Sequence, residues 1–104
     1  MFSINEKEFY IENAVEMNKR YPKTFFIPSQ EDIDKLKAGD CVKLIFVLKI
    51  RKKGDFYAER MWVQILNIHN GIFIGTLDNK PFCLKSIKHD DIVSFRAENI
   101  ACIE

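Results

Sequence analysis

Long hydrophobic runs are absent from this 104-residue sequence, whose longest, Leu44–Leu48, has five residues. A helix needs roughly 20 apolar residues to cross a bilayer, so a transmembrane protein is excluded. The first residues hold neither a basic stretch nor an apolar one, and we therefore expect no secretory signal. Glycine and proline are scarce, at four and three residues, and the composition excludes a collagen and a disordered chain. The length predicts one globular domain over residues 1–104.

Cysteine is scarce and irregularly spaced. The three cysteines, Cys41, Cys83 and Cys102, lie in or beside apolar stretches, which is typical of reduced thiols in a core. A secreted protein of this size more often carries an even and denser set, so we predict a cytoplasmic protein. The sequence has no Cys-x-x-Cys and no His-x-x-x-His pair, and we expect no metal and no other cofactor.

An excess of one charge is also missing, because 16 basic and 15 acidic residues give a net charge of +1. Residues 41–60 are the exception, with six basic and two acidic side chains. Among them, Arg51, Lys52, Lys53 and Arg60 are candidate binding residues in a predicted hairpin. This hairpin suits single-stranded nucleic acid or an acidic protein, or it is a solvated tip whose lysines discourage sheet pairing.

The first part of the chain, residues 1–38, carries the period of helices. Ser3 has the spacing of an N-terminal cap, and apolar side chains recur at helical spacing from Tyr10 onward until Pro22 ends the pattern. These features predict an N-terminal helix. A second, short helix is predicted from Ser29 to Lys37, with Ser29 as its cap.

From Cys41 the hydrophobic period changes from 3.6 to 2, which indicates β-strands in residues 39–104. Both faces of the first strand are apolar, so we expect it inside the sheet or beneath a helix. Asn70-Gly71 is a hairpin signal, and Gly75 within a strand suggests a bulge or a close backbone approach. Strands are predicted at 41–50, 60–68, 72–77, 82–84 and 91–96, with a helical turn at 97–102.

Two segments that lead into strands resemble each other. Leu36–Leu44 and Ile87–Phe95 both contain an apolar residue, a lysine, a turn pair, an aspartate and an alternating strand. Turns favour these residue types, so each is interpreted as a tight turn that feeds a strand. Together the patterns predict an α+β fold. An N-terminal helix and a short second helix pack on a strongly twisted antiparallel sheet of about five strands, or on a partly open small barrel.

No pattern that carries catalysis stands out. The cysteines lack a neighbouring basic cluster that would lower a thiol pKa, and the sequence has no glycine-rich phosphate loop. We therefore predict that the protein is not an enzyme and assign no catalytic residues. A small-molecule-binding domain or hydrolase with a pocket near Trp62 and Asn79 stays open as an alternative.

Two short runs are the most specific in the sequence: Glu59-Arg60-Met61-Trp62 and Leu77-Asp78-Asn79-Lys80-Pro81. With the turn segments described above, they resemble a bacterial domain of unknown function, the YegJ-like group. The resemblance covers roughly residues 21–100. The second turn departs from the pattern, because His89-Asp90 stands where a glycine is expected before the aspartate. That departure puts the shape of this turn in question.

The resemblance implies a small protein that neutralises a toxin by binding it, without established catalytic residues. We accordingly expect another protein as the partner and add Trp62, Asp78 and Asn79 to the candidate binding residues. Trp62 suits a core anchor equally well, and Asn79 suits a turn. The apolar connector 24–28 is either a docking site or a lid over the core.

Overall fold

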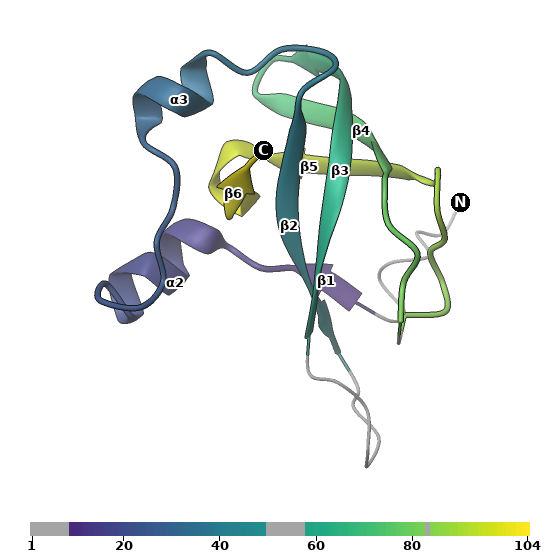
Figure 1. Ribbon diagram of the computed structural model, residues 1–104, viewed down its shortest axis with the longest axis horizontal. Helices are drawn as coiled ribbons and strands as arrows, with labels where there is room; N and C mark the ends of the chain where they lie inside the picture. Colours follow the sequence, from purple (N-terminus) through teal and green to yellow (C-terminus); the bar gives the residue numbers. More distant parts are fainter. Residues whose placement is uncertain (1–8, 50–57, 83) are drawn as a thin grey trace.

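The computed structural model describes residues 9–49, 58–82 and 84–104 (Figure 1). Two short helices lie to one side of a curved antiparallel sheet, which confirms the predicted α+β fold. The basic residues 51–53 fall outside the described residues. The elements are, in order, β1 (Phe9–Ile11), α2 (Ala14–Arg20), α3 (Gln30–Asp34), β2 (Cys41–Leu48), β3 (Ala58–His69), β4 (Ile72–Leu77), β5 (Ile92–Arg96), η1 (Ala97–Asn99) and β6 (Cys102–Ile103).

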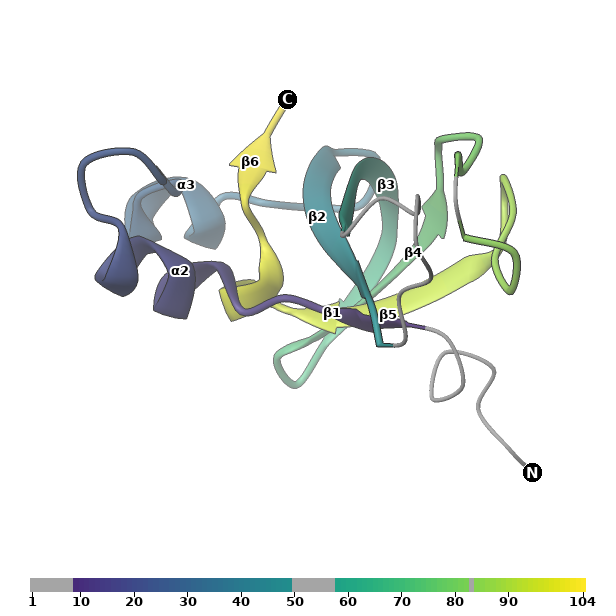
Figure 2. The ribbon, with the colours of Figure 1, turned by 90° about the horizontal axis from the view of Figure 1, so that it is seen from below.

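The sheet has six strands in the order β1-β2-β3-β4-β5, and β6 also pairs with β2. Every pair is antiparallel. Figure 2 shows how the strands curl around a common interior, so the sheet approaches a barrel with one open seam. Four of the five predicted strands are confirmed, and they become β2, β3, β4 and β5.

Alternate residues of the strands build the core inside this barrel. On β2, the side chains of Val42, Leu44 and Phe46 are fully buried. Across the barrel, Phe73 of β4 stacks on Phe95 of β5, with the ring centres 5.2 Å apart. Burial of these apolar surfaces is the main term that stabilises such a sheet.

The opposite face of β2 is buried as well, at Ile45 and Val47. Ala14 of α2 and Phe25 of the following connector pack against this face. The two-sided apolar pattern of β2 therefore comes from a strand that lies between the barrel core and a helix, as predicted. The same packing holds the connector between α2 and α3 against the sheet.

The predicted N-terminal helix is wrong in its first part. Tyr10 belongs to β1, which pairs with β2, and the helix begins only at Ala14. β1 forms because this edge of β2 is open to another strand and because Phe9 buries its ring in the core. The observed cap is Asn13, whose Oδ1 accepts the N–H of Glu16 at 3.0 Å.

Other differences concern the ends of elements. The predicted cap Ser3 lies outside the described residues. The second helix is shorter than predicted, at Gln30–Asp34, although Ser29 caps it as expected. Phe82 and Leu84 lie in no strand, because the N–H groups of both bond to a carboxylate described below. β6 is an unpredicted strand that follows the predicted helical turn, here the short helix η1.

Two glycine predictions are confirmed. Asn70 and Gly71 join β3 to β4 with positive φ angles of 51° and 80°. A Cβ atom at Gly75 would lie 2.5 Å from the backbone oxygen of Gln64, so β4 approaches β3 too closely for a side chain there. The close approach coincides with an irregularity in the pairing of β3 with β4.

Candidate functional site

The structure brings together the two specific sequence runs. Trp62 of β3 is half-buried, and its backbone N–H donates a hydrogen bond to Oδ1 of Asn79. The Trp62 carbonyl accepts a second hydrogen bond from the N–H of Asp78, at 2.8 Å. The indole ring faces Lys43 of β2, whose Nζ lies 4.6 Å from the ring centre. The Asn79 side chain thus holds the turn after β4 on β3.

Glu59 fixes the next segment of the same loop. Its carboxylate accepts the N–H of Phe82 at 2.6 Å and the N–H of Leu84 at 2.9 Å. Both hydrogen bonds are charge-assisted, which makes them stronger than ordinary backbone pairs. The binding of these two N–H groups by Glu59 was not predicted from the sequence. The one sequence signal for this role is that Glu59 is the first residue of the Glu59–Trp62 run.

The first of the two similar turns is tied to β3 by reciprocal hydrogen bonds. Oδ2 of Asp40 accepts the N–H of Lys37 at 3.0 Å, which closes the turn. The N–H of Gly39 donates to the carbonyl of Ile65 at 2.8 Å, and the N–H of Ile65 donates to the carbonyl of Asp40 at 2.8 Å. Gly39 has a φ of 99°, which favours glycine.

The second turn repeats this arrangement on β4. Oδ2 of Asp91 accepts the N–H of Lys88 at 2.9 Å. The N–H of Asp90 donates to the carbonyl of Leu77 at 2.8 Å, and the N–H of Leu77 donates to the carbonyl of Asp91 at 2.9 Å. Asp90 adopts a φ of 75° in the place of the expected glycine. The departure in sequence therefore leaves the turn in the same shape as the first.

An exposed histidine lies between two carboxylates next to this turn. Nε2 of His89 is 3.6 Å from Oδ1 of Asp78, and its Nδ1 is 3.3 Å from Oδ2 of Asp90. More than half of each side chain is exposed to solvent. Asp78, a candidate binding residue, thus lies on the surface with its carboxylate accessible.

Arg60, the candidate of the basic hairpin that the structure describes, lies on another part of the surface. It is exposed, and its guanidinium carbon is 5.5 Å from the centre of the Phe25 ring. This contact is a cation–π interaction that covers the connector from outside. Among the described residues, the structure thus joins Trp62, Asp78 and Asn79 to one another, whereas Arg60 packs on the connector.

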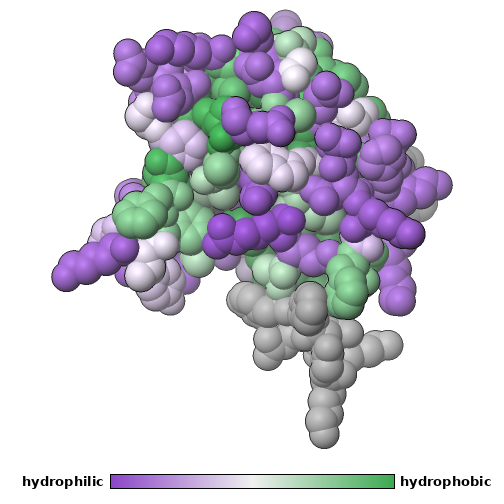
Figure 3. Space-filling model, in the orientation of Figure 1, coloured by the Kyte–Doolittle hydropathy of each residue, from purple (hydrophilic) through white to green (hydrophobic). Residues whose placement is uncertain are grey.

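A groove of about 730 Å³ opens between the connector, the first repeated turn and β6. Figure 3 shows hydrophobic side chains among hydrophilic ones on this face of the molecule. Three separate parts of the chain form the groove, and no local sequence pattern signals it. Its apolar lining consists of Phe26, Ile27, Pro28, Leu36, Ala101 and Ile103.

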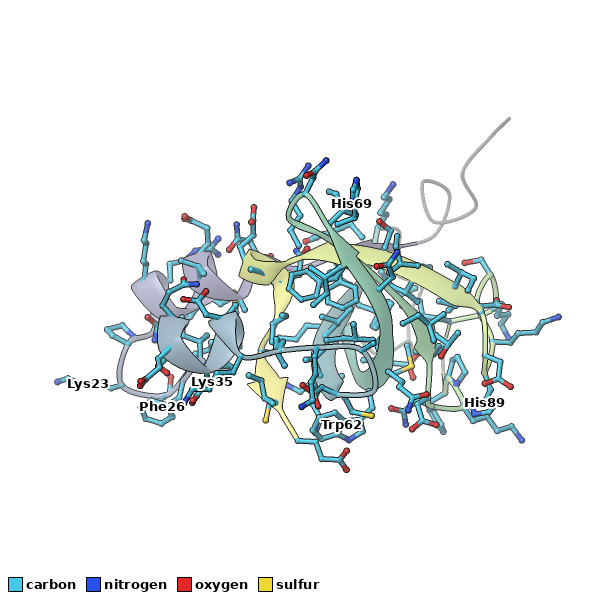
Figure 4. All side chains as sticks on the ribbon, turned by 90° about the horizontal axis from the view of Figure 1, so that it is seen from above. Lys23, Phe26, Lys35, Trp62, His69 and His89 are labelled. Carbon is cyan, nitrogen blue, oxygen red and sulfur yellow. The ribbon has the colours of Figure 1, made fainter. Side chains whose placement is uncertain are left out.

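The connector has one buried and one exposed aromatic residue. Phe25 is 9% exposed and covers the outer face of the sheet, whereas Phe26 is 72% exposed at the groove. Figure 4 shows Phe26, Lys35 and Trp62 along the same edge of the molecule. The two predictions for the connector therefore apply to different residues. Phe25 covers the sheet as a lid, and Phe26 is available for contact with a partner.

Two cysteines, Cys41 and Cys102, also line the groove. Cys41 is half-buried and Cys102 is exposed, so the prediction that they are core residues is wrong. For Cys41 the reason is that α2 covers β2 only toward its other end, at Ile45 and Val47, whereas Cys102 lies on the short strand β6. Burial raises the pKa of the Cys41 thiol, and the Glu104 carboxylate adds to the rise. The thiol is therefore protonated near neutral pH and a weak nucleophile.

In the part of the chain that the structure describes, no three His, Cys, Asp or Glu residues are grouped so that they could hold a metal ion. Within residues 9–49, 58–82 and 84–104, no helix has the length and hydrophobicity needed to span a bilayer.

Comparisons with known proteins identify a family. A search of the curated proteins and a search of the solved structures each found no match. One family model matches residues 8–102, which is nearly the whole chain. This match confirms the bacterial domain of unknown function that the sequence motifs indicate. The chain belongs to the DUF2314 family, whose description is uncharacterized protein conserved in bacteria.

Proposed function

We propose that this domain is not an enzyme and acts by binding another protein at the groove beside Phe26. One observation carries the proposal: Phe26 exposes 72% of its side chain at a groove whose lining combines apolar residues with charged ones. Aromatic side chains with an apolar pocket beside them and a polar rim are typical of the energetic centre of protein interfaces.

The backbone that presents Phe26 is held in place. The carbonyl of Phe25 accepts a hydrogen bond from Nδ2 of Asn18 at 2.7 Å. The N–H of Phe25 donates a hydrogen bond to the carbonyl of Tyr21 at 2.8 Å. Pro28 restricts the chain on the other side. An exposed side chain on a fixed backbone loses little conformational freedom on binding, which favours affinity.

The polar groups of the groove favour binding over catalysis. Lys37 pairs with Asp40, with Nζ and Oδ1 3.6 Å apart. Burial raises the pKa of the Cys41 thiol, so it is not activated as a nucleophile. These groups suit a rim that contacts a partner.

The finer proposal is that the partner is a toxin and that binding in the cytoplasm neutralises it. It rests on the resemblance of the Glu59–Trp62 and Leu77–Pro81 runs to the YegJ-like group. A neutralising protein needs a stable surface and no active site, which agrees with the groove described above.

The test is capture of partners by the tagged protein in a bacterium that encodes it. We compare the unchanged protein with Phe26→Ser and with Tyr21→Ser, which removes another exposed aromatic ring outside the groove. We expect one stoichiometric protein with the unchanged chain and Tyr21→Ser, and its loss with Phe26→Ser. The same proteins on all three baits would contradict the proposal, and nuclease-sensitive RNA on them would favour the nucleic-acid alternative.

The toxin proposal has its own readout. The captured protein is expressed alone and then together with this chain. Growth arrest in the first case and normal growth in the second support neutralisation, while unchanged growth in both cases contradicts it and leaves protein binding standing.

A further inference from the structure

The edge of β6 faces the same groove, and this sets the shape of a suitable partner segment. Figures 1 and 2 show β6 between β2 and helix α3. The N–H of Glu104 donates to the carbonyl of Cys41 at 3.1 Å, so Glu104 is a hydrogen-bonded position of the β2–β6 pair. Because backbone groups alternate in direction along a strand, those of Ile103 turn away from β2.

An outward-facing N–H and C=O beside a groove that holds apolar side chains form a site where a strand can be added. The carbonyl of Ile103 has a weak neighbour, the Sγ atom of Cys102 at 3.7 Å. The side chains of Phe26, Ile27 and Leu36 lie across the groove from β6. An extended segment would thus place one apolar side chain between them and β6 while its backbone pairs with Ile103.

The charged residues on the two sides of the groove favour one orientation of the bound segment. Lys23 and Lys35 flank Phe26 on the connector side (Figure 4). Neither lysine forms an ion pair within the described part of the chain. The connector side also carries Asp32 of α3, so two lysines stand against one carboxylate there, while Lys37 and Asp40 pair with each other. The β6 side carries Glu104. An acidic side chain is therefore favoured beside Phe26 and disfavoured beside Glu104.

We infer that the groove binds an extended segment of the partner, which adds as a strand to β6 at Ile103. The segment carries an apolar residue for the groove and an acidic residue for the lysines beside Phe26. This inference rests on the proposed function, since it names the way in which a protein partner would bind.

The test uses a phage-displayed library of random ten-residue peptides, selected on the whole protein. Ile103→Pro removes the outward N–H without breaking a bond to β2, and Ile103→Val is the matched control that keeps it. We expect enriched peptides with an acidic residue next to alternating apolar residues. Their affinity should fall about tenfold with Ile103→Pro and stay within about twofold with Ile103→Val.

Charge is tested on the same peptides with Lys35→Gln and, as control, with the exposed Lys80→Gln. Weaker binding with the first and unchanged binding with the second support the acidic contact, and equal binding overturns it. Peptides that bind Ile103→Pro as well as the unchanged protein overturn strand addition, and so does a library that yields no binder. The capture experiment with Phe26→Ser then decides separately whether the groove binds a folded protein.

Discussion

Gly39 and Asp90 occupy the same position in two turns that share one hydrogen-bond scheme, although they are far apart in the sequence. Each N–H donates at 2.8 Å to the carbonyl of a buried residue in a neighbouring strand, Ile65 or Leu77. Both have a positive φ, 99° and 75°. The turns that lead into β2 and β5 are therefore anchored to the neighbouring strands β3 and β4 by the same hydrogen bonds, once with glycine and once with aspartate.

Replacing Asp90 with glycine should stabilise the protein. A positive φ costs free energy for any residue with a Cβ atom, and the contact of Asp90 with His89 is exposed and weak. We expect Asp90→Gly to raise the free energy of unfolding by about 0.5–1 kcal/mol, measured by urea denaturation. Gly39→Ala should do the reverse, and a loss of stability with Asp90→Gly would contradict the equivalence of the two turns.

Replacing Glu59 should loosen the loop after β4. The carboxylate holds two backbone N–H groups, and hydrogen bonds to a charged group each contribute about 1.5–3 kcal/mol. Glu59→Gln keeps the size but removes the charge and one acceptor oxygen. We expect the free energy of unfolding to fall by about 1.5–3 kcal/mol, whereas the exposed Glu98→Gln should change it by less than about 0.5 kcal/mol. Equal effects would mean that the Glu59 hydrogen bonds contribute nothing.

Replacing Asn79 tests whether this candidate binding residue stabilises the fold or contacts the partner. Asn79→Ala leaves the N–H of Trp62 without its acceptor, and we expect a loss of about 1–3 kcal/mol in the free energy of unfolding. Asn79→Asp keeps an acceptor oxygen and should recover most of that loss. If Asn79→Ala instead reduced partner binding at unchanged stability, Asn79 would be a binding residue.

The raised pKa of Cys41 predicts slow alkylation and a pH-dependent stability. Iodoacetamide should modify Cys102 before Cys41 at pH 7.5, as followed by mass spectrometry of peptides. The pKa of the Cys41 thiol is higher in the folded protein than in the unfolded chain. The contribution of this thiol to the free energy of unfolding is therefore complete below the unfolded pKa of about 8.5. It is lost as the pH rises through the folded pKa. Glu104→Gln should speed the reaction of Cys41, and an unchanged rate would contradict the role of Glu104.

Much of the barrel could be predicted from the sequence because its signals are local. The alternation from Cys41 onward, the Asn70-Gly71 turn and Gly75 each act within a few residues. β1 and β6 could not be predicted in this way. They are short, and they form because distant parts of the chain find the open edge of β2. The apolar spacing from Tyr10 also fits a helix, so the pattern alone could not separate the two.

The candidate site could be predicted only in part, for a similar reason. Trp62, Asp78 and Asn79 stood out as one set, and the structure joins them through backbone hydrogen bonds. The groove depends on the connector, a turn and the C-terminal strand meeting in space. The sequence marked the connector 24–28 as apolar, but burial of Phe25 and exposure of Phe26 follow from where α2 packs on β2.

Binding of a partner protein at the groove beside Phe26 can be tested by photo-crosslinking in living cells of a bacterium that encodes the protein. A benzophenone amino acid replaces Lys35 at the groove or Arg96, which is exposed on β5. We expect one protein crosslinked from position 35 and none from position 96. Crosslinking from position 96 with none from position 35, or from neither position, would contradict binding at the groove beside Phe26.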